Sequence, residues 1–312
     1  MDPLPRAQHA PVSGALPAAH RWGIYEKALS ADQTWPEKLE TAAKAGYQFI
    51  ELSVDESEER LARLEWTCGQ RRELRGALAE APASIDTMCL SAHRKYPLGS
   101  ESKPVRERGL EIMQRAVCLA AELGIRMIQV AGYDVFYEES NERTHAFYEE
   151  SLRRSAEWAR SACVMLALEN VDCPFMDSIT KGLRFIRGVN SPWLQMYPDI
   201  GNLAATGKDV PGELRAGGLH IVGVHVKDTR AGEFRRVPLG AGGVDFDGAF
   251  RALREIDFRG PLTVEMWNEA APDPEAVITE ARRWLGGKME GTASELQDSH
   301  SGGMPTARAR KL

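Results

Sequence analysis

Short apolar runs alternate with longer segments of helical periodicity along most of the chain. Eight of the runs have the length and the content of β-branched, aromatic and aliphatic residues that are typical of buried strands. They are Trp22–Tyr25, Phe49–Leu52, Ser84–Leu90, Met127–Val130, Val164–Leu168, Leu194–Tyr197, Ile221–Val226 and Leu262–Met266. The segments that follow predict helices over Pro36–Ala45, Gly69–Glu80, Val105–Leu123, Thr144–Ser161, Ile179–Val189, Phe246–Arg254 and Pro274–Leu285. The connection Leu203–Gly218 has a weaker pattern and predicts only a short helix.

This alternation predicts an α/β fold in which βα units form a parallel sheet. Eight such units over roughly 265 residues match the size of a (β/α)8 TIM barrel, which we predict as a single domain. A doubly wound sheet is the alternative. It is disfavoured because Gly-Ile-Tyr-Glu-Lys stands at the first strand, where a dinucleotide-binding fold would have G-x-G-x-x-G. Glycines at Gly46, Gly124 and Gly286–Gly287 are expected to end the preceding helices.

The barrel is expected to span residues 21–287, with a segment of different composition at each end. Residues 1–20 are rich in Pro, Ala and His without periodicity, which predicts a disordered leader. Residues 288–312 have a low apolar content and predict a disordered tail.

Composition restricts the classes of function. The chain has 312 residues and a net charge of −6, which argues against nucleic acid as its main ligand but allows a local basic pocket for a small anion. Five cysteines without C-x-x-C pairs are typical of reduced, intracellular thiols. No segment has the pattern of a transmembrane helix or a signal peptide, so we expect a cytoplasmic protein that does not bind membranes.

Four predicted strands end in residues that can bind metal ions. The fifth leads to Glu169, the sixth to Asp199, the seventh to His225 and the eighth to Glu265. Taken singly, such a carboxylate is more often a helix cap or an ion-pair partner, and such a histidine is more often a core residue. Because the C-terminal ends of barrel strands meet at one face, the set together predicts a site for one divalent ion, Mn²⁺, Mg²⁺, Co²⁺ or Zn²⁺.

The chain also resembles a known family through several motifs. They are GIYEKAL (23–29), ELSVDES (51–57), CLSAHRKYPLGSE (89–101), QVAGYDVFY (129–137), YPDIGNL (197–203), HVKDT (225–229), VPLGAGGVDF (237–246) and VEMWNE (264–269). Through them the sequence is similar to the sugar isomerase/epimerase superfamily with the xylose-isomerase-like barrel. More narrowly, it resembles the L-ribulose-5-phosphate (L-xylulose-5-phosphate) 3-epimerases of L-ascorbate and pentose degradation. The motifs cover nearly all of residues 22–285.

The resemblance implies roles for the four strand-end residues. In that family the residues that match Glu169, Asp199, His225 and Glu265 bind the metal, and the two glutamates also act as acid and base. Many members of the wider superfamily have a histidine three residues after the metal aspartate, where this chain has Asn202. The Asp-x-His that trinuclear zinc endonucleases need after the seventh strand is also missing, which argues against DNA repair.

The expected activity is therefore metal-dependent interconversion of L-xylulose 5-phosphate and L-ribulose 5-phosphate through an enediolate. Removal of the C3 proton on one face of the sugar and return of a proton on the other would use both glutamates. An isomerase or epimerase of an unphosphorylated ketose or a hexulose 6-phosphate is the alternative, and a non-catalytic sugar-phosphate-binding protein is a third. A homodimer is compatible with the family, although no feature of the sequence determines it.

For the substrate phosphate, we predict a site at the third βα loop. Ser100 or Ser102 would cap the helix that follows, and Lys27 and Arg94 would add positive charge. The glycine-rich loop 240–243 is the alternative phosphate site, and the two basic residues are equally consistent with plain solvated side chains.

Four further residues are predicted to line the mouth of the barrel. Glu51 and His93 are expected to hydrogen-bond sugar hydroxyls, with structural ion pairing as the alternative. Tyr133 and Trp267 are expected to form pocket walls.

Overall fold

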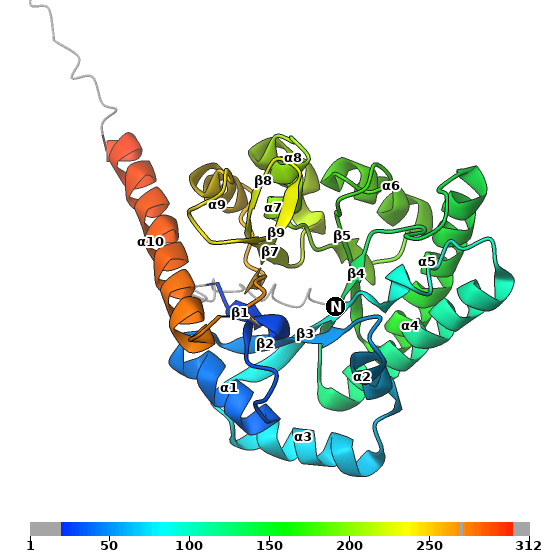
Figure 1. Ribbon diagram of the computed structural model, residues 1–312. Coiled ribbons are helices and arrows are strands. Elements are labelled where there is room, and N and C mark those ends of the chain that lie inside the picture. The colour runs from blue at the N-terminus through cyan, green and yellow to red at the C-terminus, as the bar shows by residue number, and fades with distance from the viewer. Residues whose placement is uncertain (1–19, 269–270, 302–312) are drawn as a thin grey trace, which may run out of the picture.

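The computed structural model describes residues 20–268 and 271–301, and its main sheet is a closed ring of parallel strands (Figure 1). The strands are β1 (Trp22–Tyr25), β2 (Phe49–Val54), β3 (Ser84–Leu90), β4 (Met127–Ala131), β5 (Met165–Glu169), β6 (Leu194–Met196), β7 (Val224–Val226) and β10 (Leu262–Val264). They pair in the order β6-β5-β4-β3-β2-β1-β10-β7. Parallel bridges from Met196 to Ile221 and from Asp199 to His225 join the two ends of this sheet. The predicted TIM barrel is confirmed.

Helices surround the strands (Figure 1). The α-helices are α1 (Trp35–Lys44), α2 (Glu58–Leu61), α3 (Cys68–Glu80), α4 (Lys103–Leu123), α5 (Glu142–Ala162), α6 (Ile179–Val189), α7 (Ile200–Ala205), α8 (Val210–Gly217), α9 (Phe246–Glu255) and α10 (Pro274–Ser301). Short 3₁₀ turns are η1 (Glu26–Ala28), η2 (Ala62–Glu65), η3 (Ala92–Arg94) and η4 (Gly218–His220). The weakly patterned connection Leu203–Gly218 thus contains the second half of α7 and all of α8.

Local sequence explains why these elements form and where their apolar faces point. Every residue of β2 is buried, as expected for a parallel strand that is covered on both sides. Helix α9 buries Phe246, Phe250 and Leu253, whose spacing places them on one face towards the barrel. Gly124 ends α4 with φ of 78°, a left-handed conformation that glycine adopts without strain.

A hairpin after β7 was not predicted from the sequence. Strands β8 (Asp228–Arg230) and β9 (Glu233–Val237) pair antiparallel. Asp228 also accepts hydrogen bonds from the backbone N–H groups of Gly240 and Gly242, at 2.9 and 2.8 Å. A Cβ atom on Gly242 would lie 2.1 Å from the Asp228 carboxylate, so the close approach requires glycine. These donors of the glycine-rich loop are therefore already used within the protein.

The C-terminal helix also differs from the prediction. The pair Gly286–Gly287 was expected to end a helix, but it lies inside α10. Arg254 of α9 donates to the carbonyl of Met289 and to the hydroxyl of Thr292, both at 2.8 Å. These contacts hold α10 against α9 just beyond the glycines, and the helix continues to Ser301, over part of the segment that was predicted as a tail.

The remaining terminal predictions, the leader over residues 1–19 and the tail over 302–312, fall outside the described residues.

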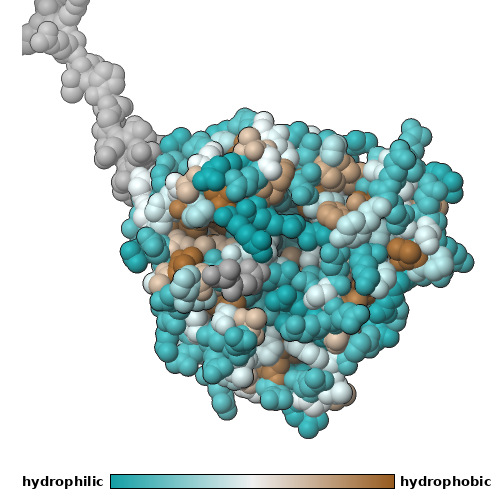
Figure 2. Space-filling model, in the orientation of Figure 1, coloured by the Kyte–Doolittle hydropathy of each residue, from teal (hydrophilic) through white to brown (hydrophobic). Residues whose placement is uncertain are grey.

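On the face of the molecule in Figure 2, hydrophilic residues predominate and apolar residues form small separate groups. In the described parts of the chain, no helix is both long and apolar enough to cross a membrane.

A buried ionic network connects the start of the barrel with its second βα unit. Glu26 is 1% exposed and accepts from both terminal nitrogens of Arg63, at 2.5 and 2.8 Å. It also accepts from the backbone N–H of Ser53 at 2.9 Å and lies 3.4 Å from the ammonium of Lys38. Burial by itself would raise the pKa of Glu26, but Arg63, Lys38 and the Ser53 N–H together lower it. The folded protein therefore favours the ionised carboxylate.

Replacing Glu26 by Gln should lower the free energy of unfolding by about 3 kcal/mol, because Arg63 would remain buried without its counter-ion. Since the pKa of Glu26 is depressed on folding, its stabilisation is present above the ordinary value of 4.5 and is lost as the pH falls below it. Urea unfolding from pH 7 to pH 3 checks both points. Glu40→Gln, which alters an exposed pair with Lys44, is the control and should change little. An equal effect of both variants would contradict the prediction.

Candidate metal centre and active site

Four ionisable side chains meet at the C-terminal ends of adjacent strands. Glu169 ends β5, Asp199 is the N-cap of α7 just after β6, His225 lies in β7, and Glu265 follows β10. Each offers one potential ligand atom, and these atoms all lie within 4.8 Å of one another. The structure thus brings together the four residues that the sequence singled out as metal ligands.

Asp199 shows most directly that the group suits a cation. Its Oδ1 atom accepts from the backbone N–H of Asn202 at 2.8 Å and so caps α7. Its Oδ2 atom is buried and accepts no well-directed hydrogen bond, although the Lys227 ammonium lies 2.8 Å away. Lys227 is one cation that stabilises this buried oxygen, and a divalent ion held among the four side chains would be another. Three carboxylates and one imidazole fit the donor preferences of Mn²⁺, Mg²⁺, Co²⁺ or Zn²⁺.

His225 is held between two carboxylates. Its Nδ1 atom lies 2.8 Å from Glu169 Oε1, and its Nε2 atom lies 2.7 Å from Glu51 Oε2. Glu51 is fully buried in β2, where it also accepts from the hydroxyl groups of Thr87 and Tyr197, at 2.9 and 3.3 Å. Glu51 was predicted to bind a sugar hydroxyl. The structure instead places it behind the imidazole, where a carboxylate orients a metal-binding histidine.

Lys227 is a member of the site that the sequence analysis missed. Its ammonium lies 2.8 Å from Asp199 Oδ2 and 2.7 Å from Glu265 Oε2, and the side chain is almost fully buried. The signal in the sequence was its position two residues after His225, which places both side chains on the same side of an extended chain.

The environment separates the proton affinities of the carboxyl groups. Burial raises the pKa of Glu169 and raises that of Asp199 to about 7, against the lowering effects of His225 and Lys227. Burial acts in the same direction on Glu265, but Lys227 and His225 outweigh it and hold its pKa at about 2. The pKa of His225 lies well above its ordinary value, because the surrounding carboxylates outweigh its burial.

A small cavity opens from Glu169 and Glu265 towards the mouth of the barrel. Its other lining residues are Arg94, Tyr133, Val171, Asp172, Asn202, Lys227, Phe234 and Arg235. Tyr133 therefore lies at the wall where it was expected, and Trp267 lies beside an adjoining cavity that also contacts Lys227 and Glu265. Arg235 comes from the unpredicted hairpin and lies over the ring of Trp267, 5.6 Å from its centroid.

Of the residues predicted to bind phosphate, only Arg94 lines the cavity beside the metal centre. Lys27 pairs with Asp55 at 2.5 Å. Ser100 is buried and donates to Glu138 at 2.8 Å, while its oxygen accepts from the backbone N–H of Ser102. The carboxylate of Glu138 would repel an anion at this position, so these contacts oppose the predicted phosphate site at the start of α4.

His93 was expected to contact the sugar, but its ring nitrogen Nε2 lies 3.1 Å from the carbonyl oxygen of Gly109 in α4. The side chain is 1% exposed, and burial lowers its pKa to about 4. The observed contact joins η3 to α4, which is a structural role.

Comparisons with known proteins agree with the barrel fold. The model of the family described as xylose isomerase-like TIM barrel matches residues 39–287. The chain is 50% identical over 267 residues to L-ribulose-5-phosphate 3-epimerase UlaE of Escherichia coli, both in strain SMS-3-5 and in O157:H7. These matches cover 86% of this chain and 94% of the relatives.

Solved structures show the same fold at lower sequence identity. A structure of L-ribulose 3-epimerase has a TM-score of 0.76 and 22% identity, and covers 92% of this chain and 100% of that one. A D-allulose 3-epimerase from Methylomonas sp. has a TM-score of 0.73 and 20% identity, and covers 86% of this chain and 98% of that one.

Replacing Glu51 by Gln should weaken the affinity for Mn²⁺ about tenfold while the fold is retained, because the imidazole would lose the charge that orients it. Calorimetric titration of the metal-free protein with MnCl₂ gives the affinity, and circular dichroism checks the fold. The control is Glu56→Gln, a carboxylate on the following loop that bonds Tyr137 and should leave the affinity unchanged. Unchanged affinity in Glu51→Gln would show that the contact with His225 does not support metal binding.

Proposed function

Because the chain belongs to the xylose isomerase-like TIM barrel family, we propose that it is a metal-dependent 3-epimerase that interconverts L-xylulose 5-phosphate and L-ribulose 5-phosphate. The observation that carries the proposal is the 50% identity to UlaE across 94% of the length of that relative. The expected enzyme class, isomerase, is confirmed by the names of these relatives. The buried group of three carboxylates and one histidine supports the choice of a metal-dependent reaction.

Glu169, Asp199, His225 and Glu265 are the residues that would hold the ion. A divalent ion there supplies a Lewis acid for the carbonyl and hydroxyl oxygens of the sugar. Glu51 would keep the imidazole oriented, and Lys227 offsets part of the negative charge of Asp199 and Glu265. The cavity beside Glu169 and Glu265 is small, which would limit the water that reaches the reacting carbons of a bound sugar.

The proposed chemistry is proton transfer at C3 of a 2-ketose. That proton is acidic because it lies next to the carbonyl carbon, and its removal produces an enediolate. Glu169 and Glu265 come from β5 and β10, which are separated around the barrel by β6 and β7. We assign one to remove the proton from one face of the sugar, and the other to return a proton to the opposite face.

For the substrate phosphate, we propose Arg94 and Arg235 in place of the start of α4. Both line the cavity next to Glu169 and Glu265. Among the described residues, neither arginine forms an ion pair with a carboxylate, so both guanidinium groups can take an anion. Guanidinium groups bind phosphate by paired, charge-assisted hydrogen bonds. Ring contacts hold both, since Arg94 lies 5.6 Å from the centroid of Tyr133 and Arg235 packs on Trp267.

The Mn²⁺-loaded protein is incubated with L-ribulose 5-phosphate in D₂O, and NMR follows the C3 position of the sugar. The C3 proton should exchange with deuterium, and the configuration at C3 should invert. EDTA should stop both processes if the metal is required. Exchange at C1 in place of C3 would indicate an aldose–ketose isomerase, and no exchange at any carbon would indicate a binding protein. Either result would contradict the proposal.

The variants Glu169→Gln and Glu265→Gln should each lower the rate of C3 inversion by at least about 100-fold, because each removes one proton carrier. Glu40→Gln on the surface of α1 is the control. Substantial inversion in both site variants would eliminate the two-glutamate scheme.

Replacing Arg235 by Gln should raise KM for L-ribulose 5-phosphate by about 10- to 100-fold, because a hydrogen bond between charged groups is lost. Arg94→Gln should act in the same direction, whereas Ser100→Ala should have little effect. Steady-state kinetics with L-ribulose and L-ribulose 5-phosphate test this, because only the phosphorylated sugar should lose affinity. The opposite ranking, with Ser100→Ala the most impaired, would restore the site at the start of α4.

A further inference from the structure

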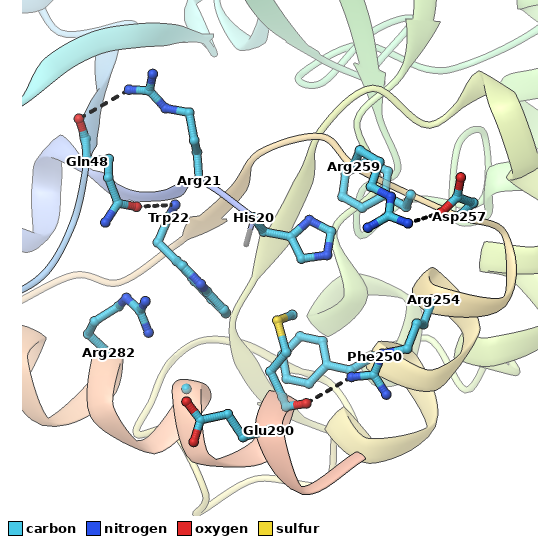
Figure 3. Close-up of a pocket in the computed structure, with 13 residues that line it drawn as sticks. His20, Arg21, Trp22, Gln48, Phe250, Arg254, Asp257, Arg259, Arg282 and Glu290 are labelled. Atoms are coloured by element: carbon cyan, nitrogen blue, oxygen red, sulfur yellow. Dashed lines mark hydrogen bonds and ion pairs between the residues drawn. The ribbon is translucent and has the colours of Figure 1, made fainter. Parts of the chain in front are cut away.

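A cavity at the N-terminal end of the barrel is lined by charged side chains that already have partners in the protein. Arg259 pairs with Asp257, and Arg254 donates to the carbonyl of Met289 (Figure 3). The cavity beside the metal centre differs, because its lining includes Asp172, a carboxylate that forms no ion pair among the described residues. Neither the candidate metal ligands nor the two proposed phosphate-binding arginines account for Asp172.

Asp172 lies on the loop after β5, three residues beyond Glu169, and lines the same cavity as Glu169 and Glu265. Its Oδ1 atom accepts a hydrogen bond from the phenol of Tyr133. Its Oδ2 atom has no hydrogen-bond partner in the described part of the chain, and the residue is exposed. One oxygen of the carboxylate is therefore held by the protein, while the other can accept a hydrogen bond from a ligand in the cavity.

Tyr133 supplies a donor that keeps its proton. Its side chain is 3% exposed, and Arg94 lies against the ring, 5.6 Å from the centroid. Burial and the neighbouring Asp172 carboxylate outweigh the positive charge of Arg94, so the pKa of the phenol lies well above its ordinary value of 10. The phenol therefore acts as a donor to Asp172, which leaves the second carboxylate oxygen as an acceptor.

Close packing of the loops after β4 and β5 fixes this pair beside Glu169. The N–H of Gly132 donates to the Glu169 carbonyl at 3.1 Å, and the N–H of Val171 donates to the Met176 carbonyl at 2.8 Å. A Cβ atom on Gly132 would lie 2.4 Å from the Met176 side chain and 2.5 Å from the Glu169 carbonyl oxygen, so this approach requires glycine. The backbone thus holds the pair next to a residue that we assign to proton transfer at C3.

The two sugars of the proposed reaction differ at C3 and share one configuration at C4. The candidate metal site would take the oxygens at C2 and C3, and Arg94 and Arg235 would take the phosphate on C5. Neither contact involves the C4 hydroxyl. Because the bond between C4 and C5 rotates, the phosphate of either C4 epimer can reach the arginines. Selection of the L sugars therefore needs a third contact, at C4.

Apart from the arginines and glutamates already assigned, the polar residues that line the cavity are Tyr133, Asp172, Asn202 and Lys227. Tyr133 donates to Asp172, and Lys227 pairs with two carboxylates of the metal centre. Asn202 donates from Nδ2 to the carbonyl of Asn170 at 2.9 Å, which leaves it a neutral acceptor. Asp172 offers a charged acceptor that no cation occupies, and a hydroxyl binds such a group more strongly than a neutral one.

We propose that Asp172 accepts a hydrogen bond from the C4 hydroxyl of the sugar and thereby selects the L configuration at this carbon. The order of the groups supports the assignment, since C4 is bonded to C3 and Asp172 follows Glu169, which we assign to C3, along the chain. Tyr133 is a positioning residue, because its phenol fixes the carboxylate that the sugar contacts. This specificity rests on the proposed epimerase function and deepens it.

The test compares L-ribulose 5-phosphate with D-xylulose 5-phosphate, which differs from it only in the configuration at C4. With the Mn²⁺-loaded protein, the rate of C3 exchange gives KM for the first sugar, and inhibition of that exchange gives the inhibition constant of the second. In the wild-type protein the inhibition constant should exceed KM at least about tenfold, because only the L sugar directs its C4 hydroxyl to Asp172. Asp172→Ala should raise KM by about 10- to 100-fold and leave the inhibition constant within about twofold.

A parallel change of both constants in Asp172→Ala, in either direction, would overturn the proposal, because it would show a general effect of the charge or of the fold. An unchanged KM would overturn it as well, as would equal constants in the wild-type protein. Loss of selectivity in Asn202→Ala but not in Asp172→Ala would assign the hydroxyl to the amide instead. Circular dichroism checks that the variants fold.

Two further variants examine the role of Tyr133. Tyr133→Phe keeps the ring beside Arg94 and removes the donor to Asp172, so KM should rise about three- to tenfold while the inhibition constant stays the same. Equal effects on both constants would show that Tyr133 has only a structural role. Glu56→Gln is the matched control, because Glu56 also accepts from a phenol, that of Tyr137, but does not line the cavity, and it should change neither constant.

The same measurements separate a wrong specificity residue from a wrong function. If the wild-type protein exchanges no C3 proton of L-ribulose 5-phosphate, the epimerase function itself is contradicted, and the role of Asp172 with it. If exchange occurs but both constants change in parallel in Asp172→Ala, only the role of Asp172 is contradicted.

Discussion

The burial of four carboxyl groups at one end of the barrel is the constraint on which the rest of the site depends. Glu51, Glu169, Asp199 and Glu265 are each less than a tenth exposed. Like charges at this depth repel one another and lose their hydration, so each needs a cation or a hydrogen-bond donor. The imidazole of His225 lies between Glu51 and Glu169, and the ammonium of Lys227 lies between Asp199 and Glu265. Two protein cations for four carboxyl groups leave negative charge for a divalent ion to balance.

Barrel closure produces this arrangement. The bridge between Asp199 and His225 joins β6 to β7, and the backbone N–H of His225 donates to the Pro198 carbonyl at 2.8 Å. This contact brings the sixth strand beside the seventh and so places the two groups next to each other. The strand ends hold the candidate metal ligands, while the loop after β3 and the β8–β9 hairpin bring Arg94 and Arg235 to the cavity beside them. In barrel enzymes, residues on rigid strand ends and residues on the loops that follow them commonly share one site.

The two ends of the barrel carry side chains of different chemistry. Side chains at the C-terminal ends are acidic and paired with cations, whereas the opposite end has arginines around aromatic rings.

Asp228 shows that a glycine-rich loop can bind a carboxylate of the protein itself in place of a ligand. Its carboxylate takes the N–H groups of the glycine-rich loop, so that loop folds around a carboxylate of the protein itself. A glycine-rich sequence alone does not reveal whether its donors are already used.

The sequence by itself determined the eight strands, most of the helices and the four metal-binding candidates. Periodicity and residue type are local, and a carboxylate or histidine at a strand end is visible in one short segment. Tertiary structure alone decided which partner each side chain meets. Glu51 and His225 are 174 residues apart, so only the closed barrel shows that Glu51 orients the imidazole. Likewise, Glu138 opposes an anion at Ser100, and contacts with α9 carry α10 past two glycines. These outcomes depend on distances between segments that are remote in sequence, which no local pattern encodes.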